Sequence, residues 1–198
     1  MSWSDAALLI VDLQNDFLHP DGAYARGGQA NADIAALPTR LAPLARAMRA
    51  AGVLVVSTHF TLVPGRGGEP MISPHLKAMR PFLCKGDFAP GAWGHALVEE
   101  LAPSDIQIEK IAYSAFYMTR LEWVLRKSGV TRLVVGGIVS NGGVASTVRD
   151  AHVRDLEVAV LADGCAAFDR ATHETAIAAL KPVARITTIA DMLAEIGA

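Results

Sequence analysis

Cysteine, charged residues and long apolar runs are scarce in this sequence, and each scarcity excludes a class of protein. The two cysteines, Cys84 and Cys165, stand far apart among 198 residues and match no metal-binding spacing. Isolated cysteines are typical of free thiols in a reducing compartment, so we expect a cytoplasmic protein without disulfides. No apolar run approaches the roughly 18 to 20 residues of a membrane-spanning helix. Residues 1–5 also lack the basic start of a signal peptide.

Charge is low and balanced. Lys and Arg number 18 against 20 Asp and Glu, which gives a net charge of −2, and the basic residues are spread along the chain. This excludes the basic stripe of a nucleic-acid-binding protein and the basic arm of a membrane-binding one, so we expect a small-molecule partner. A content of 52% hydrophobic residues is enough for one sizeable core, in a single domain of residues 1–198. It also favours a homo-oligomer with a buried interface.

Short apolar runs alternate with helical patterns along the chain. Strands are predicted at residues 6–11, 53–58, 106–108, 132–138, 158–161 and 184–187. Helices are predicted at residues 34–48, 93–101, 121–125, 142–154, 172–180 and 190–196. The alternation is typical of an α/β fold with a three-layer doubly wound sheet, in which about six mainly parallel strands have helices on both faces. The stretch 59–92 is rich in Gly and Pro, and its length predicts a lid or pocket wall.

Polar residues stand where three of these strands end. Asp12 closes the first strand, Lys110 follows the third, and the glycine-rich turn 136–143 follows the fourth. The carboxyl ends of parallel strands share one edge of the sheet, so the three segments are predicted to meet there. A carboxylate beside an ammonium in an apolar pocket suits acid–base chemistry, because burial and mutual attraction shift their pKa values. Taken alone, the residues favour a solvated turn at Asp12 and a surface side chain at Lys110 over acid–base chemistry, because Asp and Lys are common in such turns.

The motifs around these residues resemble those of the isochorismatase-like hydrolase superfamily. They are VDLQNDF at 11–17, EK at 109–110, YSAF at 113–116, GIVSNGGV at 137–144, STVRDA at 146–151, ADG at 162–164 and His173. The superfamily includes nicotinamidases, carbamoylsarcosine and ureido amidohydrolases, and isochorismatases. The resemblance implies a doubly wound α/β fold, assembly as a homodimer or homotetramer, and catalytic roles for Asp12 and Lys110.

The resemblance also locates a missing nucleophile. The amidases carry a catalytic cysteine in the first turn after the fourth strand, and that position is Gly143 in this chain. Ser140 and Ser146 lie three residues away and point elsewhere, so neither replaces it. True isochorismatases carry glycine there and cleave a vinyl ether without a covalent intermediate. The resemblance therefore implies non-covalent hydrolysis of a small carboxylate or carbonyl metabolite, with Asp12 as general acid or base and Lys110 as electrostatic or substrate anchor.

Two alternatives stay open. An amidohydrolase would use a water activated by Asp12 and Lys110, whereas an inactive descendant, natural or altered at Gly143, would only bind a small molecule. Residues 57–61 lack the glutamine of true isochorismatases, which leaves the substrate open. The same residues lack the Asp-x-His motif of the zinc-binding nicotinamidases, so we expect neither a metal nor another cofactor.

Further pocket residues are predicted from their places beside these motifs. The turn Val139, Ser140, Asn141 and Gly142 is expected to line the site. The resemblance places a non-proline cis peptide bond between Val139 and Ser140, which would aim backbone N–H groups inward. His59, at the end of the second strand, is another candidate. Aromatic side chains that could form apolar walls are Phe17, Tyr24, Trp93 and Phe116.

Overall fold

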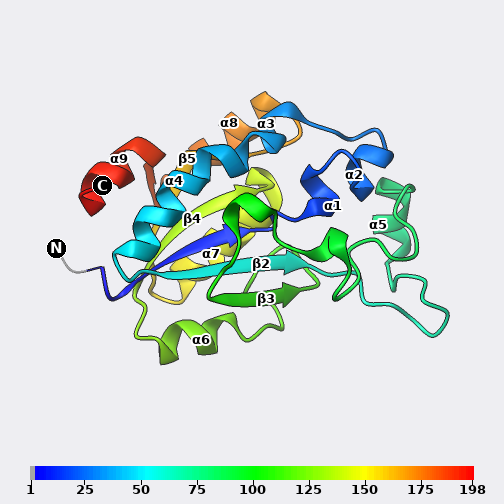
Figure 1. Cartoon of the computed structure of the whole chain (residues 1–198), viewed down its shortest axis with the longest axis horizontal. Coiled ribbons are helices and arrows are strands. Elements are labelled where there is room, and N and C mark those ends of the chain that lie inside the picture. The colour runs from blue at the N-terminus through cyan, green and yellow to red at the C-terminus, as the bar shows by residue number, and fades with distance from the viewer. Residues whose placement is uncertain (1–2) are drawn as a thin grey trace.

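The chain is built around one parallel sheet. The computed structural model describes residues 3–198, so residues 1–2 of the predicted domain and N-terminal segment lie outside the described part. Within these residues, six strands follow the order β3-β2-β1-β4-β5-β6 (Figure 1). They are β1 Ala6–Val11, β2 Leu54–Phe60, β3 Ile106–Lys110, β4 Arg132–Ile138, β5 Glu157–Ala166 and β6 Arg185–Thr187. The order runs outward from β1 in one direction and from β4 in the other, which confirms the predicted doubly wound α/β fold.

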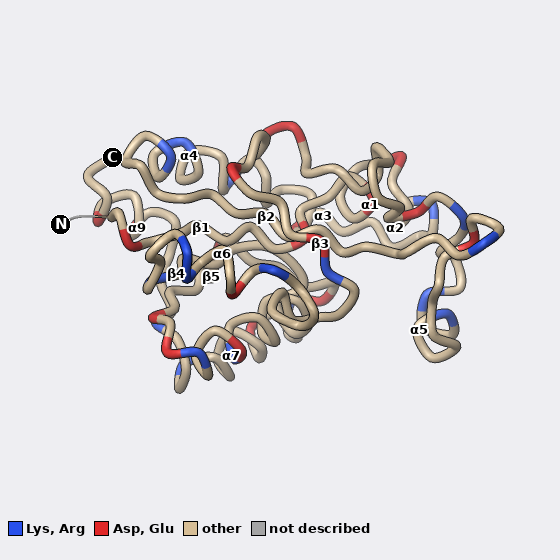
Figure 2. The backbone as a smooth tube through the Cα atoms, turned by 90° about the horizontal axis from the view of Figure 1, so that it is seen from below, with Lys and Arg blue, Asp and Glu red and all other residues tan. Residues whose placement is uncertain are grey.

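Strand β1 is buried on both sides, because successive side chains point to opposite faces of the sheet. Leu8 and Ile10 belong to the core that contains α4 (Leu37–Ala50). Leu9 and Val11 belong to the opposite core, with α7 (Ala145–Val153). Figure 2 shows these two helices on opposite sides of the strands. A strand buried on both faces reads as a continuous apolar run, as residues 6–11 do.

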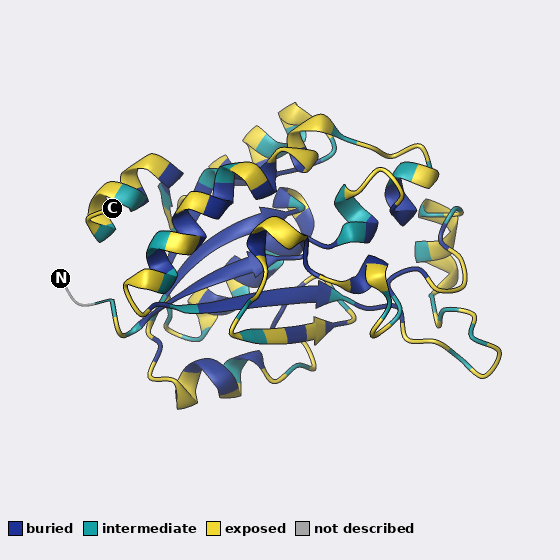
Figure 3. Ribbon diagram, in the orientation of Figure 1, coloured by how far each residue is buried: buried dark blue, intermediate teal, exposed yellow. Residues whose placement is uncertain are grey.

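Helices cover both faces. α4 and α9 (Ile189–Ile196) contribute to the first core, and α6 (Leu121–Lys127) and α7 contribute to the second. The remaining helical segments are α1 Asn15–Leu18, α2 Ala23–Arg26, α3 Ala32–Ala35, α5 Pro74–Met79, α8 Arg170–Ala178, the 3-10 turns η1 Trp93–His95 and η2 Glu99–Leu101, and the π-helical turn η3 Ser140–Val144. Figure 3 shows buried inner strands, whereas the edge strand β3 mixes buried and exposed residues. No helix in the described residues is long and apolar enough to cross a bilayer.

Some predicted helix boundaries are wrong. The stripe predicted as one helix at 34–48 divides into α3 and α4, and Pro38 falls in the first turn of α4, where a missing N–H is tolerated. The helix predicted at 93–101 is instead the two 3-10 turns η1 and η2.

Some predicted strand ends are also wrong. β2 continues to Phe60, so His59 lies inside it, and β3 includes Lys110 as its last residue. β5 runs on to Ala166 instead of closing at 162–164, with a shift in its register against β4. Neighbouring strands decide these ends by hydrogen bonding, which an apolar run in the sequence does not report.

The irregular stretch 59–92 is held against the sheet at defined points. The side-chain amide of Gln14 donates to the carbonyls of Phe60 (3.0 Å) and His95 (2.9 Å), and its oxygen accepts from the N–H of Phe60 (2.7 Å). The Asp16 carboxylate accepts from the N–H of Phe88 at 2.6 Å. These buried contacts place the loop, with α5 on it, over the carboxyl ends of the strands.

Candidate active site

Asp12 is the first residue after β1 and has an unusual backbone. Its φ is +57°, in the left-handed region that Asp tolerates better than most residues. The Asp12 N–H donates to the carbonyl and to Oγ1 of Thr58 on β2, both at 3.2 Å. The Thr58 hydroxyl donates in turn to Asp12 Oδ1 at 2.7 Å. Backbone and carboxylate are therefore both fixed by one threonine.

Lys110 reaches Asp12 from the last residue of β3, across the intervening strand β2. Lys110 Nζ lies 2.6 Å from Asp12 Oδ2, and the two side chains are only 2% and 6% exposed. The ammonium also donates to the Ala112 carbonyl at 3.0 Å and lies 5.7 Å from the centre of the Phe60 ring. The prediction that Asp12 and Lys110 lie close together is confirmed.

The environment of Asp12 sets its proton affinity. Burial raises the pKa of the carboxyl above its usual value, while the Lys110 charge and the hydrogen bonds from Lys110 and Thr58 act in the opposite direction. Burial is the largest of these causes, so the pKa of Asp12 is raised. A carboxyl of this kind suits proton transfer at moderate pH better than a solvated aspartate does.

The part of the turn after β4 that lies near Asp12 is its backbone. Gly137 has a φ of +129°, and a Cβ atom there would stand 2.1 Å from the Val11 carbonyl oxygen, so only glycine fits. The cis peptide bond joins Ile138 to Val139, one residue before the predicted place. The N–H groups of Gly142 and Val144 donate to the Val139 carbonyl at 2.9 and 3.2 Å. These two donors are therefore engaged within the turn and do not point into the site.

Gly143 lies beside the carboxylate and has no room for a side chain. A Cβ atom on it would stand 2.7 Å from the Ile138 carbonyl oxygen, 3.3 Å from Asp12 Oδ2 and 3.3 Å from Val11 Cγ1. The Ile138 carbonyl oxygen is thus closer to this position than Cβ atoms normally allow. A side chain here would require the turn itself to move.

Asp12, Lys110 and Gly143 border one cavity of about 310 Å³. Phe17 and Val139 line it as predicted, and so does Tyr24. The sequence did not identify the other lining residues, which are Phe60, His75, Leu76, Met79, Arg80, Leu83, Ile111, Ala112, Tyr113, Ile138 and Phe168. Most of those from residue 60 to 83 belong to the irregular stretch 59–92, whose length did signal a pocket wall.

His59 lies beneath the cavity and does not border it. Its Nδ1 lies 2.9 Å from the His95 carbonyl, and its Nε2 lies 2.8 Å from Ser57 Oγ. Because a carbonyl only accepts, Nδ1 carries the proton and Nε2 accepts from the serine. The neighbouring residues Thr58 and Phe60 point the other way, towards Asp12 and the cavity, as alternation along a strand requires.

Two of the predicted aromatic walls also lie elsewhere. Trp93 is 54% exposed, and its ring meets the edge of the His19 ring at 4.9 Å. Phe116 is buried in the core on the α7 side, beneath the guanidinium of Arg154 at 4.7 Å. An edge-to-face contact at the surface accounts for Trp93, and core packing accounts for Phe116.

Three residues of the predicted turn lie behind the cavity wall. Ser140 is buried, with its hydroxyl 2.7 Å from Nδ1 of His173 on α8. Asn141 is exposed and borders a separate hollow beside α8. Gly142 packs behind the wall, because a Cβ atom there would touch Val139 at 3.0 Å and Tyr113 at 3.2 Å.

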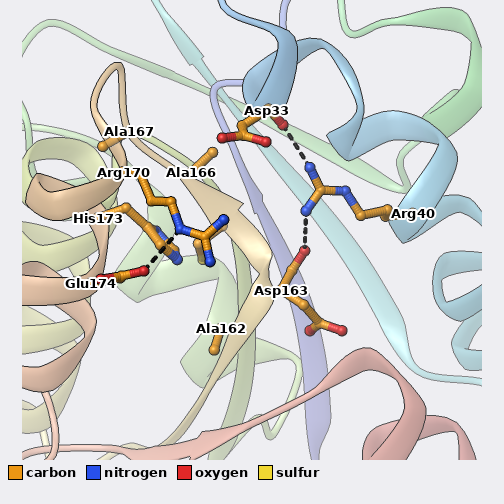
Figure 4. Close-up of a pocket in the computed structure, with 10 residues that line it drawn as sticks. Asp33, Arg40, Ala162, Asp163, Ala166, Ala167, Arg170, His173 and Glu174 are labelled. Carbon is orange, nitrogen blue, oxygen red and sulfur yellow. Dashed lines mark hydrogen bonds and ion pairs between the residues drawn. The ribbon is translucent and has the colours of Figure 1, made fainter.

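A second cavity, of about 220 Å³, lies between α3, α4, β5 and α8 and does not include Asp12 or Lys110 (Figure 4). Arg40 donates there to the carbonyls of Asp163 (3.1 Å) and Asp33 (2.8 Å). Arg170 pairs with Glu174 at 2.9 Å. Both arginines of this cavity thus have protein partners, and the Asp12–Lys110 pair borders the first cavity instead.

Neither cysteine borders the cavity at Asp12. Cys165 is buried inside β5, and burial raises the pKa of its thiol to about 12. Cys84 is exposed in the loop, near the Asp87 carboxylate. Among residues 3–198, no group of three or more His, Cys, Asp or Glu side chains is arranged to hold a metal ion.

Known proteins share this sequence pattern and fold. The isochorismatase domain matches residues 6–191. The chain is 38% identical to the ureidoacrylate amidohydrolase RutB of Methylobacterium radiotolerans over 178 residues, which are 84% of this chain and 66% of that protein. It is 37% identical to the RutB protein of Stutzerimonas stutzeri over 192 residues, 88% of this chain and 72% of the relative.

Solved structures agree. A cysteine hydrolase from Pseudomonas syringae pv. phaseolicola has a TM-score of 0.85 and 26% identity, and the match covers 100% of this chain and 94% of that one. N-carbamoylsarcosine amidase from Thermoplasma acidophilum has a TM-score of 0.73 and 25% identity, with 93% and 96% covered. The sheet order, the site and these matches together show that the chain belongs to the isochorismatase family of hydrolases.

Proposed function

We propose that this protein hydrolyses a small carboxylate or carbonyl metabolite without a covalent intermediate. The observation that carries the proposal is the contact between Gly143 and its surroundings. Gly143 carries no nucleophile, and a side chain there would come within 2.7 Å of the Ile138 carbonyl oxygen. The hydroxyl of Ser140 is turned to His173, so the turn supplies no thiol or hydroxyl beside Asp12. Water is then the nucleophile, and Asp12 is the group that moves the proton.

The first candidate reaction is cleavage of a vinyl ether, as in isochorismatase. Asp12, in its protonated form, would donate its proton to the terminal vinyl carbon, and the electron pair of the double bond would form the new C–H bond. Water would attack the resulting oxocarbenium-like carbon and return a proton to Asp12, after which the ether C–O bond breaks and leaves an alcohol and a carbonyl product. The raised pKa of Asp12 supports this role, because a general acid must hold its proton.

The second candidate reaction is hydrolysis of an amide or ureido bond, which the names of the relatives favour. Asp12 would then act as a base that takes a proton from the attacking water and passes it to the leaving nitrogen as the C–N bond breaks, which gives an acid and an amine or ammonia. Lys110, 2.6 Å from the carboxylate, would stabilise the negative charge that develops on the substrate oxygen. The cysteine of the family is replaced in this chain, so the water would attack directly.

The test is a turnover assay with two panels of substrates, enol ethers of small carboxylic acids and ureido or carbamoyl acids. Under either reaction, Asp12→Asn should lower turnover by at least about 100-fold. Asp21→Asn serves as the matched control, since Asp21 is an exposed carboxylate outside the cavity. Turnover of enol ethers alone assigns the first reaction, and turnover of ureido acids alone assigns the second. If the protein binds members of a panel and turns over none, it is a binding protein and the proposal fails.

A further inference from the structure

Arg80 is a positive charge in the wall of the cavity that no carboxylate of the protein neutralises. Its Nε donates to the Tyr24 hydroxyl at 3.0 Å, and its Nη1 donates to the Met79 carbonyl at 3.2 Å. In the part of the chain described, residues 3–198, no Asp or Glu forms an ion pair with it, and its Nη2 has no hydrogen-bond partner. A half-buried guanidinium with an unused N–H edge is suited to an anionic ligand.

Asp16 and Asp87, the two buried acidic residues of this region, already have partners. The Asp16 carboxylate accepts from the N–H groups of Ala23 and Phe88 at 3.0 and 2.6 Å. Asp87 pairs with Arg26 at 2.5 Å and accepts from the Cys84 N–H at 2.9 Å. Both serve to hold the loop together, so neither is available to Arg80.

Lys110 is less suited than Arg80 to bind an anionic ligand. Two of the three N–H donors of its ammonium are directed to the Asp12 carboxylate and the Ala112 carbonyl, and the ammonium also lies 5.7 Å from the centre of the Phe60 ring. Asp12 lies against Lys110, whereas none of the described Asp and Glu side chains lies against Arg80, so Arg80 is the basic side chain of the cavity wall without an acidic neighbour. An incoming carboxylate would therefore gain more from Arg80 than from Lys110.

Aromatic rings hold Arg80 and shape the space beside it. The Tyr24 ring, which anchors Nε, is stacked on Phe168 at 5.3 Å with an angle of 9° between the planes, and it touches Phe17 at 4.7 Å. Phe60 and Tyr113 border the same cavity. Rings packed in this way are rigid walls, and flat unsaturated groups fit between them with little loss of freedom.

We propose that Arg80 binds the substrate carboxylate, and that the cavity accepts planar carboxylic acids whose scissile bond lies at the Asp12 end. The inference rests on the proposed hydrolytic function of the same cavity. It assigns a specificity-determining residue to the C-terminal cap of α5, at the wall of the cavity, and leaves Lys110 as the partner of Asp12.

Binding can be measured without turnover by calorimetric titration with trans-cinnamate and its neutral isostere cinnamamide. Wild-type protein should bind cinnamate more tightly than cinnamamide. Arg80→Gln should weaken cinnamate binding by roughly 10- to 100-fold, as expected for a charge-assisted hydrogen bond, and leave cinnamamide binding unchanged. Arg66→Gln is the matched control, because it removes an exposed arginine of the same loop that does not border the cavity, and it should bind as wild type does.

Three results would overturn the inference: equal affinity of wild type for the two ligands, no binding of cinnamate by wild type, or unchanged cinnamate affinity in Arg80→Gln. Thermal unfolding checks that the variants fold, and Arg80→Lys, which keeps the charge and loses the planar fork, should show a smaller loss of cinnamate affinity. Asp12→Asn separates the two proposals. It should still bind cinnamate, and if it also retains full turnover, the proposed reaction fails while the assignment of Arg80 stands.

Discussion

The carbonyl oxygen of Ile138 lies 2.7 Å from the place that a Cβ atom would take on Gly143. Ile138 closes β4 and Gly143 lies in the turn that follows, so this contact joins the end of the strand to the start of the α7 segment. A Cβ atom at this position would come closer to a backbone oxygen than Cβ atoms normally do, so a side chain at Gly143 requires the carbonyl or the turn to shift.

Gly143→Ala should therefore destabilise the protein, by about 1 to 3 kcal/mol in the free energy of unfolding, because the new methyl group meets a backbone oxygen. Urea denaturation measures the change. Gly67→Ala, at a loop glycine with nothing within 4 Å of its Cβ position, is the control and should stay within about 0.5 kcal/mol of wild type. Gly143→Cys should lose stability as well and gain no amidase activity; an active, stable Cys variant would contradict the steric argument.

Asp12 and Lys110 should prove strongly coupled in a double-mutant cycle. Asp12→Asn alone leaves a buried ammonium without its anion, which is expected to lower the free energy of unfolding by about 3 to 5 kcal/mol. Replacing Lys110 with Met in the same protein removes that charge and should restore much of the stability. Urea denaturation of the two single variants and the double variant measures the coupling. Additive losses would show that the 2.6 Å pair contributes little.

The pH dependence of turnover should distinguish the two candidate reactions. Burial raises the pKa of Asp12, so its protonated form persists to higher pH than for a solvated aspartate. If Asp12 is a general acid, kcat falls as the pH rises through this pKa; if Asp12 is a general base, kcat falls as the pH drops through it. A rate profile recorded on both panels of substrates gives the direction. A kcat that neither falls at high pH nor falls at low pH would show that Asp12 does not transfer the proton.

Stability should decrease on acidification through the buried histidines. Burial lowers the pKa of His95 from 6.5 to about 4, and the nearby His59 charge acts in the same direction. The unfolded chain then takes up a proton near pH 6.5 that the folded chain refuses until about pH 4, so stability is lost as the pH falls through this window.

His95→Gln should flatten that loss in urea denaturation curves recorded across the window. The Gln amide can still donate to the Thr61 hydroxyl, which lies 2.8 Å from His95 Nε2. His152→Gln, at an exposed histidine on α7, is the control and should keep the wild-type slope. An equal slope in all three proteins would show that His95 does not govern the acid limb.

Alkylation of the thiols should leave turnover intact. Burial raises the pKa of Cys165 to about 12, so its thiol stays protonated and shielded in the folded protein. Burial and the Asp87 carboxylate also raise the pKa of Cys84, which should react slowly despite its exposure. Mass spectrometry after iodoacetamide treatment gives the extent of labelling, and Cys84→Ser provides the unlabelled reference. Activity lost in proportion to labelling would contradict a mechanism without a protein nucleophile.

The sequence predicted the sheet and the meeting of Asp12 with Lys110 because both follow from local patterns. Doubly buried strands are continuous apolar runs, and parallel topology brings their carboxyl ends to one edge. The side chains around that pair were harder to predict. His59 and Phe60 are adjacent in sequence, yet only Phe60 faces the cavity, and the choice depends on the register of β2 against β1.

The loop residues could not be placed from the sequence for a different reason. Arg80 is positioned by the Tyr24 hydroxyl, 56 residues away, and α5 is held by the fold of an irregular segment with no periodic signal. Trp93 and Phe116 are large rings beside the motifs, but one stacks on the surface and the other joins the core. Composition indicates that a ring packs somewhere, and only tertiary contacts decide where.

The residues that line the cavity come from two parts of the structure, the ends of the strands and the irregular loop. Asp12 and Lys110 sit at the ends of sheet strands, whereas His75, Leu76, Met79 and Arg80 are carried by a loop that is joined to the sheet through a few side chains such as Gln14. Changes in the length or sequence of this loop can alter which molecule the cavity binds while the strands that hold Asp12 and Lys110 stay as they are. Under the proposed function, the substrate could therefore change through the loop alone, with the Asp12–Lys110 pair and the sheet unchanged.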